Sequence, residues 1–323
     1  MKGFTMTLEH QAFGPGAHNV SAETYAADQS GEPSLSASIA HLLIAASPAH
    51  AWEASPSLNP DHEPDEKAAF DIGLAAHMLM TGVGAEIAEI DADDYRTKAA
   101  QQARDEARDA GLVPLTRLQV ADVRRMVDAA RRQMTAHGIG DPFARGAEAG
   151  TNERSLFWQA DGVCNRCRPD CMDLAAGVAY DLKTVSGYAD PEAWVRSAMS
   201  QGVDLRAAHY LDGLTALYPG EWRYRFVLLE KARPHCLAVV ELSGAALEIG
   251  RKKLRRARAI WRQCLDANDW PGWSSEIAIV DPPGWHETAW LDRESREADY
   301  RQRHGRDILA AALRWQSPQG VQA

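Results

Sequence analysis

The sequence predicts an α/β protein in which a mostly helical N-terminal part precedes a central mixed sheet flanked by helices. Three observations lead to this prediction. Apolar residues recur with helical spacing up to about residue 150, and from Asn152 onwards they alternate with polar residues. Two more alternating stretches follow, and then one long amphipathic segment. The period therefore changes from helix to strand near the middle of the chain.

Composition fits a large globular protein. The chain has 323 residues, of which 45% are hydrophobic and 25% charged. It shows no apolar run of about 18 residues and no charged-then-apolar leader, so we expect a cytoplasmic protein without a membrane partner. The formal net charge of -10 argues against a surface covered in positive charge for nucleic acid, although it leaves room for a local basic channel.

Residues 1–33 are rich in small and polar residues with little periodicity, and we expect a poorly ordered lead-in. One domain is expected over residues 34–273. Its first part, 34–150, is mostly helical, and its second part, 151–273, holds the sheet and a closing helix. Residues 274–323 are expected to be a C-terminal extension.

The helices of the first part have recognisable starts. Ser36 is a typical N-cap for a helix that ends before Pro48. A polar linker is expected over residues 55–64, followed by a helix from Asp65 that carries His77 and ends near Gly82. Two more amphipathic helices are expected over 95–111 and 117–138, the second capped by Thr116.

The alternating stretches predict three consecutive strands joined by tight turns, over 153–160, 166–174 and 177–185. Helices are then expected over 190–202 and 204–218, strands over 222–230 and 236–242, a closing helix over 244–269 and a peripheral helix over 292–315.

Five cysteines could suggest a metal site, since three of them are only two and three residues apart. On one extended strand, however, Cys167 and Cys171 would be about 13 Å apart, too far for two ligands of one tetrahedral zinc unless the strand breaks. We therefore interpret the cysteines as buried thiols that pack as small apolar side chains. They are Cys164, Cys167, Cys171, Cys236 and Cys264.

An acidic pair and a lysine are better candidates for chemistry. Asp170 on one strand, and Asp181 and Lys183 on the next, are expected to share one face of the sheet. Two neighbouring carboxylates repel unless a cation lies between them, and oxygen ligands suit Mg²⁺ or Mn²⁺. The alternative is an exposed salt bridge, but apolar neighbours on the second strand favour a buried, functional site. These neighbours are Val178, Tyr180 and Leu182.

These residues resemble the PD-(D/E)xK nucleases, with Pro169-Asp170 and Asp181-Leu182-Lys183 as the literal motif. Further segments occur in the order found in phage and prophage exonucleases of the RecE type (exodeoxyribonuclease VIII), and the resemblance extends from residue 34 to about 273. It implies a restriction-endonuclease-like core. The supporting segments are "SLSASIAHLLIAASPAHAW", "GLAAH", "NERSLFW", "AAHYLDGL" and "WPGW".

The resemblance implies a metal site and assigns particular residues to it. His77, Asp170 and Asp181 would be ligands of Mg²⁺, with Mn²⁺ as a possible substitute, and the Leu182 carbonyl would be a further ligand. Lys183 would orient and activate the attacking water.

Relatives carry a glutamine four residues before the tyrosine that corresponds to Tyr210. Arg206 stands at this position, and its guanidinium could hold a phosphate instead. Glu153 matches an acidic position of many relatives, and we expect it to act through the second shell or a bridging water.

The resemblance implies a metal-dependent deoxyribonuclease, most simply an exonuclease that converts linear double-stranded DNA into single-stranded tails for recombination. Relatives assemble into rings, so a homo-oligomer is expected, with a phage single-strand annealing protein as a possible partner. The alternatives are an end- or structure-specific endonuclease on the same core, and a DNA-binding protein with an impaired site.

The closing helix is expected to contact DNA. Four arginines lie beside an apolar stripe at helical spacing, and they could follow the phosphates. An ordinary solvated helix surface is an equally good interpretation. These residues are Arg251, Arg255, Arg258 and Arg262, and a second, less supported patch comprises Arg124, Arg125, Arg131 and Arg132.

Overall fold

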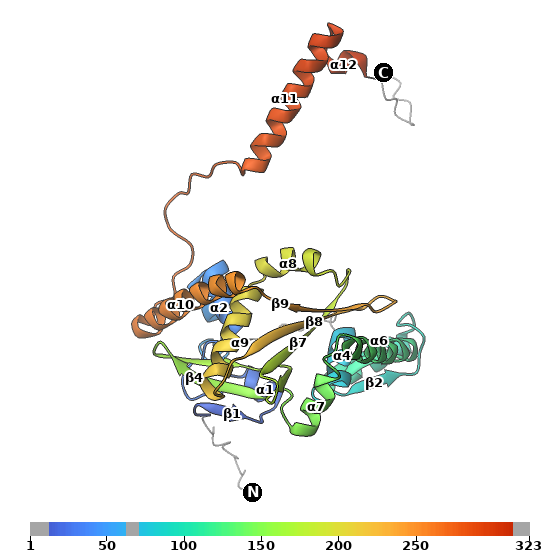
Figure 1. The fold of residues 1–323 in the computed structure, drawn as a ribbon, viewed down its shortest axis with the longest axis vertical. Helices are drawn as coiled ribbons and strands as arrows, with labels where there is room; N and C mark the ends of the chain where they lie inside the picture. The colour runs from blue at the N-terminus through green and yellow to red at the C-terminus, as the bar shows by residue number, and fades with distance from the viewer. Residues whose placement is uncertain (1–12, 63–70, 313–323) are drawn as a thin grey trace. The chain divides into compact units, whose positions relative to one another are not determined.

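The computed structural model describes residues 13–62 and 71–312 (Figure 1). The chain forms two compact units, residues 1–272 and residues 273–323. Among the described residues, no helix combines the length and apolarity needed to cross a membrane.

A four-stranded sheet forms the centre of the first unit. Its strand order is β6-β7-β8-β9. The inner pair, β7 and β8, is parallel, and both outer pairs are antiparallel, so the predicted mixed sheet is confirmed. The strands span Cys171–Asp173 (β6), Val178–Val185 (β7), Arg223–Glu230 (β8) and Leu237–Glu241 (β9).

Helices cover both faces of this sheet, as the sequence predicts for an α/β protein. One face packs against α4, α6 and α7, and the other against α8 and α9, with α10 packed on α9 (Figure 1). Their bounds are Asp71–Thr81 (α4), Arg117–Ala136 (α6), Pro142–Ala149 (α7), Pro191–Ser200 (α8), Val203–Leu217 (α9) and Gly244–Ala267 (α10).

Strand β7 presents different residues to the two faces because its side chains alternate. Val178, Tyr180 and Leu182 pack into the core beneath α4 and α6. Ala179 packs into the core beneath α9. Asp181 and Lys183 therefore point towards the α9 side of the sheet.

The α9–α10 contact is unusually close. A Cβ on Gly250 of α10 would lie only 2.1 Å from the carbonyl oxygen of Asp204 on α9. Glycine at this position therefore sets the distance between the two helices.

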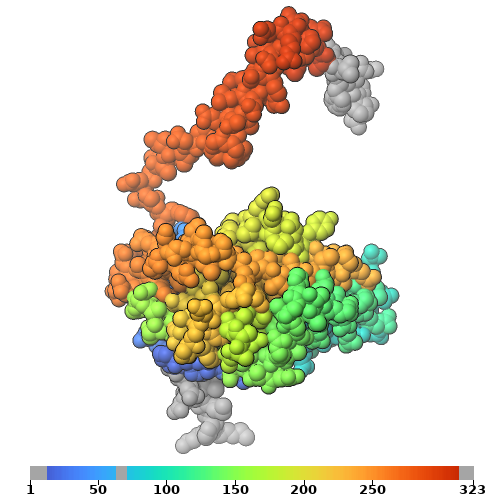
Figure 2. All heavy atoms as spheres, in the orientation of Figure 1, coloured from blue at the N-terminus to red at the C-terminus, as the bar shows by residue number. Residues whose placement is uncertain are grey.

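A second, three-stranded sheet has the order β1-β4-β5 and is antiparallel. Val163 of β5 packs in a third apolar cluster with the N-terminal helices and Trp261 of α10. Figure 2 shows one face of the first unit, on which α8 (yellow) and α10 (orange) form part of the surface. The remaining elements here are β1 (Gly16–His18), α1 (Ala22–Ala26), α2 (Ala37–Ala45), α3 (Pro48–Glu53), β4 (Ser155–Ala160) and β5 (Val163–Cys167).

Two expectations for this region are wrong. Residues 13–33 are not a poorly ordered lead-in, because β1 pairs with β4 and Asp28 is buried; residues 1–12 lie outside the described part. The expected strand 166–174 is broken, since β5 ends at Cys167 and β6 begins at Cys171. Pro169 between them has no N–H to donate to a ladder.

A small parallel pair, β2 (Ile87–Ile90) and β3 (Val113–Thr116), was not predicted. The helix α5 (Lys98–Asp109) connects the two strands. Both predicted caps of the first part are present: Ser36 accepts from Ile39 N, and Thr116 forms a reciprocal capping box with Gln119. The expected helix from Asp65 is described only from residue 71.

The second unit contains α11 (Gly284–His304) and α12 (Ile308–Ala311). Helix α11 begins earlier than the predicted 292–315 and ends at His304, and its C-cap Gly305 adopts a left-handed φ of 61°. Neither helix contains a buried residue.

Candidate metal centre

Three side chains from separate parts of the chain meet at the edge of the sheet. Nε2 of His77 lies 3.1 Å from Oε1 of Glu153 and 3.4 Å from Oδ2 of Asp170. Within residues 13–62 and 71–312, this is the one group of three such side chains close enough to share a metal ion.

Helix α4 is held against β7 by its packing. A Cβ on Gly73 would lie 2.9 Å from Oγ1 of Thr184, so α4 approaches β7 closely at this glycine. His77 lies one helical turn later on the same side of α4. The side chain of Asn152 donates to the carbonyl of Thr81, 2.7 Å away, and so fixes the residue before Glu153 to the end of α4.

Asp170 lies in the break between β5 and β6, not in a strand. Its Oδ2 accepts from the N–H of Leu182, 2.6 Å away, and its carbonyl accepts from the N–H of Glu153. The backbone of Leu182 is therefore beside the cluster, where its carbonyl stays a proposed ligand.

Asp181 and Lys183 share one face of β7. Nζ of Lys183 lies 2.5 Å from Oδ2 of Asp181. The Asp181 side chain is 2% exposed, whereas that of Lys183 is 34% exposed and can reach solvent or substrate. Asp181 is outside the three-residue cluster, and Glu153, expected only as an indirect contributor, is inside it.

The residues present fit a hard divalent cation. Two buried carboxylate oxygens lie beside cationic or imidazole nitrogens: Oε1 of Glu153 is next to Nε2 of His77, and Oδ2 of Asp181 is next to Nζ of Lys183. A buried carboxylate is costly unless a cation or a hydrogen-bond donor lies beside it, so a group of them favours positive charge at the site. One imidazole with several carboxylates suits Mg²⁺ or Mn²⁺ better than a metal that prefers thiolates.

The electrostatics of His77 agree with this assignment. Burial lowers the pKa of His77, but hydrogen bonds to Asp170 and Glu153 outweigh burial and raise the pKa to about 10. The nitrogen that faces the two carboxylates is therefore a favoured place for positive charge, whether from a proton or a metal ion.

Helix α9 places Arg206 and Tyr210 near the site, one turn apart. Burial lowers the pKa of Arg206, but the nearby Tyr210, Asp181, Tyr224 and Asp170 raise it above its usual value. The guanidinium therefore stays charged within the field of both aspartates.

Tyr224 was not predicted as a site residue. Its hydroxyl is buried without a hydrogen-bond partner among the described residues, and its pKa is raised by burial and then by Asp181. No sequence signal distinguishes it from an ordinary strand tyrosine.

A cavity of about 310 Å³ adjoins Arg206 and Tyr210. It lies at the start of α2, with Ser36, and Tyr25 and Arg166 also line it. Its position next to Arg206 and Tyr210, the expected site residues of α9, makes it a candidate path for substrate.

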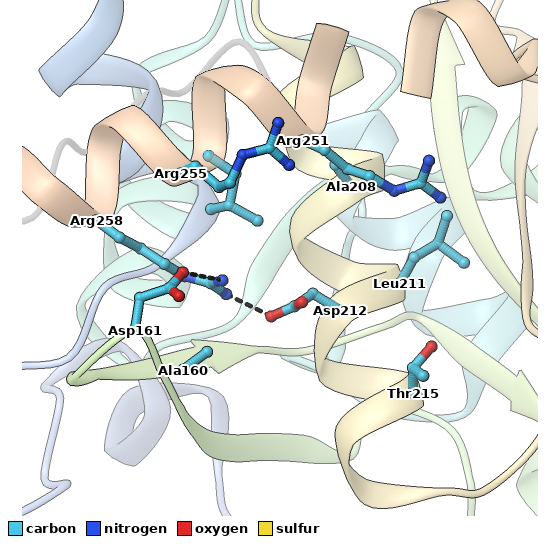
Figure 3. A pocket seen from close by; sticks show the side chains of 10 residues that line it. Ala160, Asp161, Ala208, Leu211, Asp212, Thr215, Arg251, Arg255 and Arg258 are labelled. Carbon is cyan, nitrogen blue, oxygen red and sulfur yellow. Dashed lines mark hydrogen bonds and ion pairs between the residues drawn. The ribbon is translucent and has the colours of Figure 1, made fainter. Parts of the chain in front are cut away.

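The four α10 arginines that were expected to follow the phosphates differ in their surroundings. Arg258 is buried and contacts Asn165, Asp161 and Asp212, so it cannot contact DNA as expected. Arg251 and Arg255 are exposed and lie within 3.7 and 3.4 Å of Glu248. They line a cavity of about 450 Å³ with Arg258, shown in Figure 3, that contains no member of the metal cluster. Arg262 donates to the carbonyl of Asp161.

In the second basic patch, which lies on α6, some of the arginines also form ion pairs with acidic side chains. Arg125 contacts Asp122, and Arg131 contacts Asp141 and the carbonyl of Leu79. Arg124 and Arg132 are exposed.

The cysteines are free thiols, four of them buried and Cys236 exposed. Burial raises the pKa of Cys164 to about 11 and that of Cys171 to about 12. Burial also raises the pKa of Cys167 well above its usual value. Thiols in this state are poor metal ligands because ligation requires the thiolate.

The chain is similar to a known family in sequence and to a known structure in fold. Residues 40–283 match the model of a family described as a PDDEXK-like domain of unknown function (DUF3799). The fold is similar to the crystal structure of a protein from Eubacterium rectale named "Putative exonuclease", with a TM-score of 0.54 and 12% identity. The match covers 84% of this chain and 98% of that one. No curated protein matches the sequence.

Proposed function

Because the chain belongs to the PDDEXK-like family, we propose that it is a metal-dependent deoxyribonuclease, and specifically an exonuclease that shortens linear double-stranded DNA. The observation that carries this proposal is the cluster of His77, Glu153 and Asp170 beside the Asp181–Lys183 pair. Bound Mg²⁺ or Mn²⁺ would be held by His77, Asp170, Asp181 and the Leu182 carbonyl, with Glu153 as a further ligand. The metal would polarise the phosphate and lower the pKa of a water.

The protein's own groups have distinct parts in this hydrolysis. Lys183, held by Asp181 with its ammonium accessible, orients the water that attacks phosphorus. The water oxygen bonds to phosphorus and loses a proton to solvent, while the bond from phosphorus to the departing nucleoside oxygen breaks and that oxygen takes up a proton. Arg206 and Tyr210 face the same region and are suited to hold the phosphate.

The DNA is expected to extend along exposed basic surface, including Arg251, Arg255 and Arg262 of α10. Arg258 is no longer part of this set. The acidic chain holds DNA weakly as a single subunit, so we also propose a homo-oligomer, in ring form, that encloses the duplex. A role in preparing single-stranded tails for an annealing protein would follow from this activity.

A side-by-side digest of linear and covalently closed circular duplex in Mg²⁺ tests the proposal, with solution mass measured on the same sample. Nucleotides should be released from linear DNA only. Cleavage of circles at the same rate would indicate an endonuclease, and absence of any product, with DNA still bound, would indicate a binding protein.

A further inference from the structure

Glu153 adopts a backbone conformation that needs outside support. Its φ is 54°, a left-handed value that is uncommon for a residue with a side chain. The side chain is 11% exposed, with Oε1 directed at His77. Its second oxygen, Oε2, lies 2.5 Å from Nε of Arg168.

Arg168 is itself held by the N-terminal segment. Its Nη1 donates to the carbonyl of Val20, 3.1 Å away, and its guanidinium carbon lies 5.9 Å from the centre of the Tyr25 ring. The guanidinium of Arg166 lies 5.5 Å from the same ring. One tyrosine thus contacts two buried arginines, an arrangement that stabilises positive charge in the interior.

The segment that carries Tyr25 is fixed to the core by a buried network. Asp28 contacts Arg166 at 2.7 Å and accepts hydrogen bonds from the backbone N–H of Ser34 and the hydroxyl of Ser57. Arg166 also donates to the carbonyl and hydroxyl of Ser34. Tyr25 is therefore held at a defined place beside β5.

We infer that Arg168 is a positioning residue for the metal ligand Glu153, and that Tyr25 positions Arg168. The chain of contacts extends from Tyr25 through Arg168 to Glu153 and His77. Tyr25 precedes residues 40–283, the part that matches the family model, so the N-terminal segment contributes to the metal site from outside that region. This inference rests on the proposed function.

The physical reason is the fixed direction of the Glu153 carboxylate. With Oε2 bound to Arg168, Oε1 is left to face His77 and Asp170. Without the guanidinium, the carboxylate can rotate away, and its repulsion from Asp170 favours that rotation. Loss of a side chain that holds a metal ligand in place typically weakens metal affinity by about 10–100-fold.

The test measures Mn²⁺ affinity of the full-length protein by titration calorimetry, without DNA. Arg168→Gln should bind Mn²⁺ about 10–100-fold more weakly than the wild type. Tyr25→Leu should also weaken binding, whereas Tyr25→Phe, which keeps the ring, should stay within about twofold of the wild type. This rescue by phenylalanine distinguishes support of Arg168 from a hydrogen-bonding role of the hydroxyl.

Arg225 is a matched control. It lies 2.5 Å from Glu241 and 5.8 Å from the Tyr180 ring, the same kind of arrangement away from the metal cluster. Arg225→Gln should leave Mn²⁺ affinity unchanged.

The outcomes separate this inference from the proposed function. If the wild type shows no Mn²⁺ binding that Asp170→Asn removes, the proposed metal site is wrong. If Asp170→Asn removes binding but Arg168→Gln and Tyr25→Leu bind as the wild type does, only the positioning inference is wrong. Should Arg168→Gln fail to fold, the contrast between Tyr25→Leu and Tyr25→Phe decides alone.

Discussion

Two lysine–aspartate pairs in this protein have nearly the same contact distance and the same exposure of both side chains. Lys183 contacts Asp181 at 2.5 Å, and Lys253 contacts Asp204 at 2.7 Å. In both, the lysine side chain is about one-third exposed and the aspartate is 2% exposed. The pairs differ in what else surrounds the carboxylate.

Asp204 lies in the first turn of α9, where the helix dipole favours a negative charge, and it accepts from the N–H of Leu205. Asp181 lies in the middle of a strand, and it and Asp170 both act on the guanidinium of Arg206. An ion pair alone therefore indicates nothing about function. Several carboxylates gathered with an imidazole at one place are what indicate a candidate cation site.

The largest expected difference between the pairs is in the aspartates. Asp181→Asn should reduce Mg²⁺-dependent release of nucleotides from linear DNA by about 1000-fold or more, because a proposed metal ligand is lost. Asp204→Asn should keep hydrolysis within about threefold but lower the free energy of unfolding by about 1–3 kcal/mol, measured in urea. Similar nuclease activity in both variants would contradict the site assignment.

The two lysines, Lys183 and Lys253, are expected to differ in the same way as the two aspartates. Lys183→Met should lower kcat about 100-fold or more through loss of water activation, while Mn²⁺ affinity is retained. Lys253→Met, the matched control, should leave kcat unchanged. A Lys183→Met protein that hydrolyses DNA normally would remove Lys183 from the proposed mechanism.

Arg258 is predicted to matter for stability and not for DNA contact. Arg258→Gln removes the partner of Asp212 and Asp161 and should lower the free energy of unfolding by up to about 3 kcal/mol, less than for a fully buried pair because both aspartates are partly exposed. Thermal unfolding and a DNA-binding titration on the same variant measure both effects. Weakened DNA binding without lost stability would restore Arg258 to the DNA-contact set.

The exposed arginines Arg251 and Arg255 should matter for DNA contact and not for stability. In the double variant Arg251→Ala/Arg255→Ala, the slope of log affinity against log salt should fall by about 1.8, for two lost phosphate contacts. Stability should change by no more than about 0.5 kcal/mol, because both ion pairs with Glu248 are exposed. An unchanged slope, measured by fluorescence anisotropy, would show that this face is ordinary solvated surface.

The smallest expected effect concerns the thiols. At pH 8, one thiol per native chain should react quickly with a disulfide reagent, that of Cys236, and all five should react in denaturant. Burial raises the pKa of the others, so their thiolate fraction stays small until the pH rises towards those values. About one zinc ion per chain, found by elemental analysis, would overturn the packing interpretation.

The sequence predicted the parts of the fold that depend on local pattern. The strand 177–185, the closing helix and the caps Ser36 and Thr116 follow from periodicity and short-range hydrogen bonding, and the structure has them. Residues 13–33 have no such pattern. Their order comes from the contact of Asp28 with Arg166, which is distant in sequence.

The candidate site likewise has features that the local sequence pattern predicted and features that it did not. The local spacing of Asp181 and Lys183 predicted their shared face, and the structure places them in contact. The direct place of Glu153 in the cluster depends on a left-handed backbone and on Arg168, which no sequence pattern shows. Helical spacing placed Arg258 on a basic face but could not reveal Asp161 and Asp212 opposite it.

Gly250 contributes to the fold because it has no side chain. A methyl group there would overlap the Asp204 carbonyl, so even alanine must push α10 away from α9. Helix α9 also carries Arg206 and Tyr210, so a shift of that helix would be transmitted to groups beside the carboxylates. Position 250 therefore has almost no mutational tolerance, and random mutagenesis with a selection for nuclease activity should recover glycine there as consistently as it recovers the acids themselves.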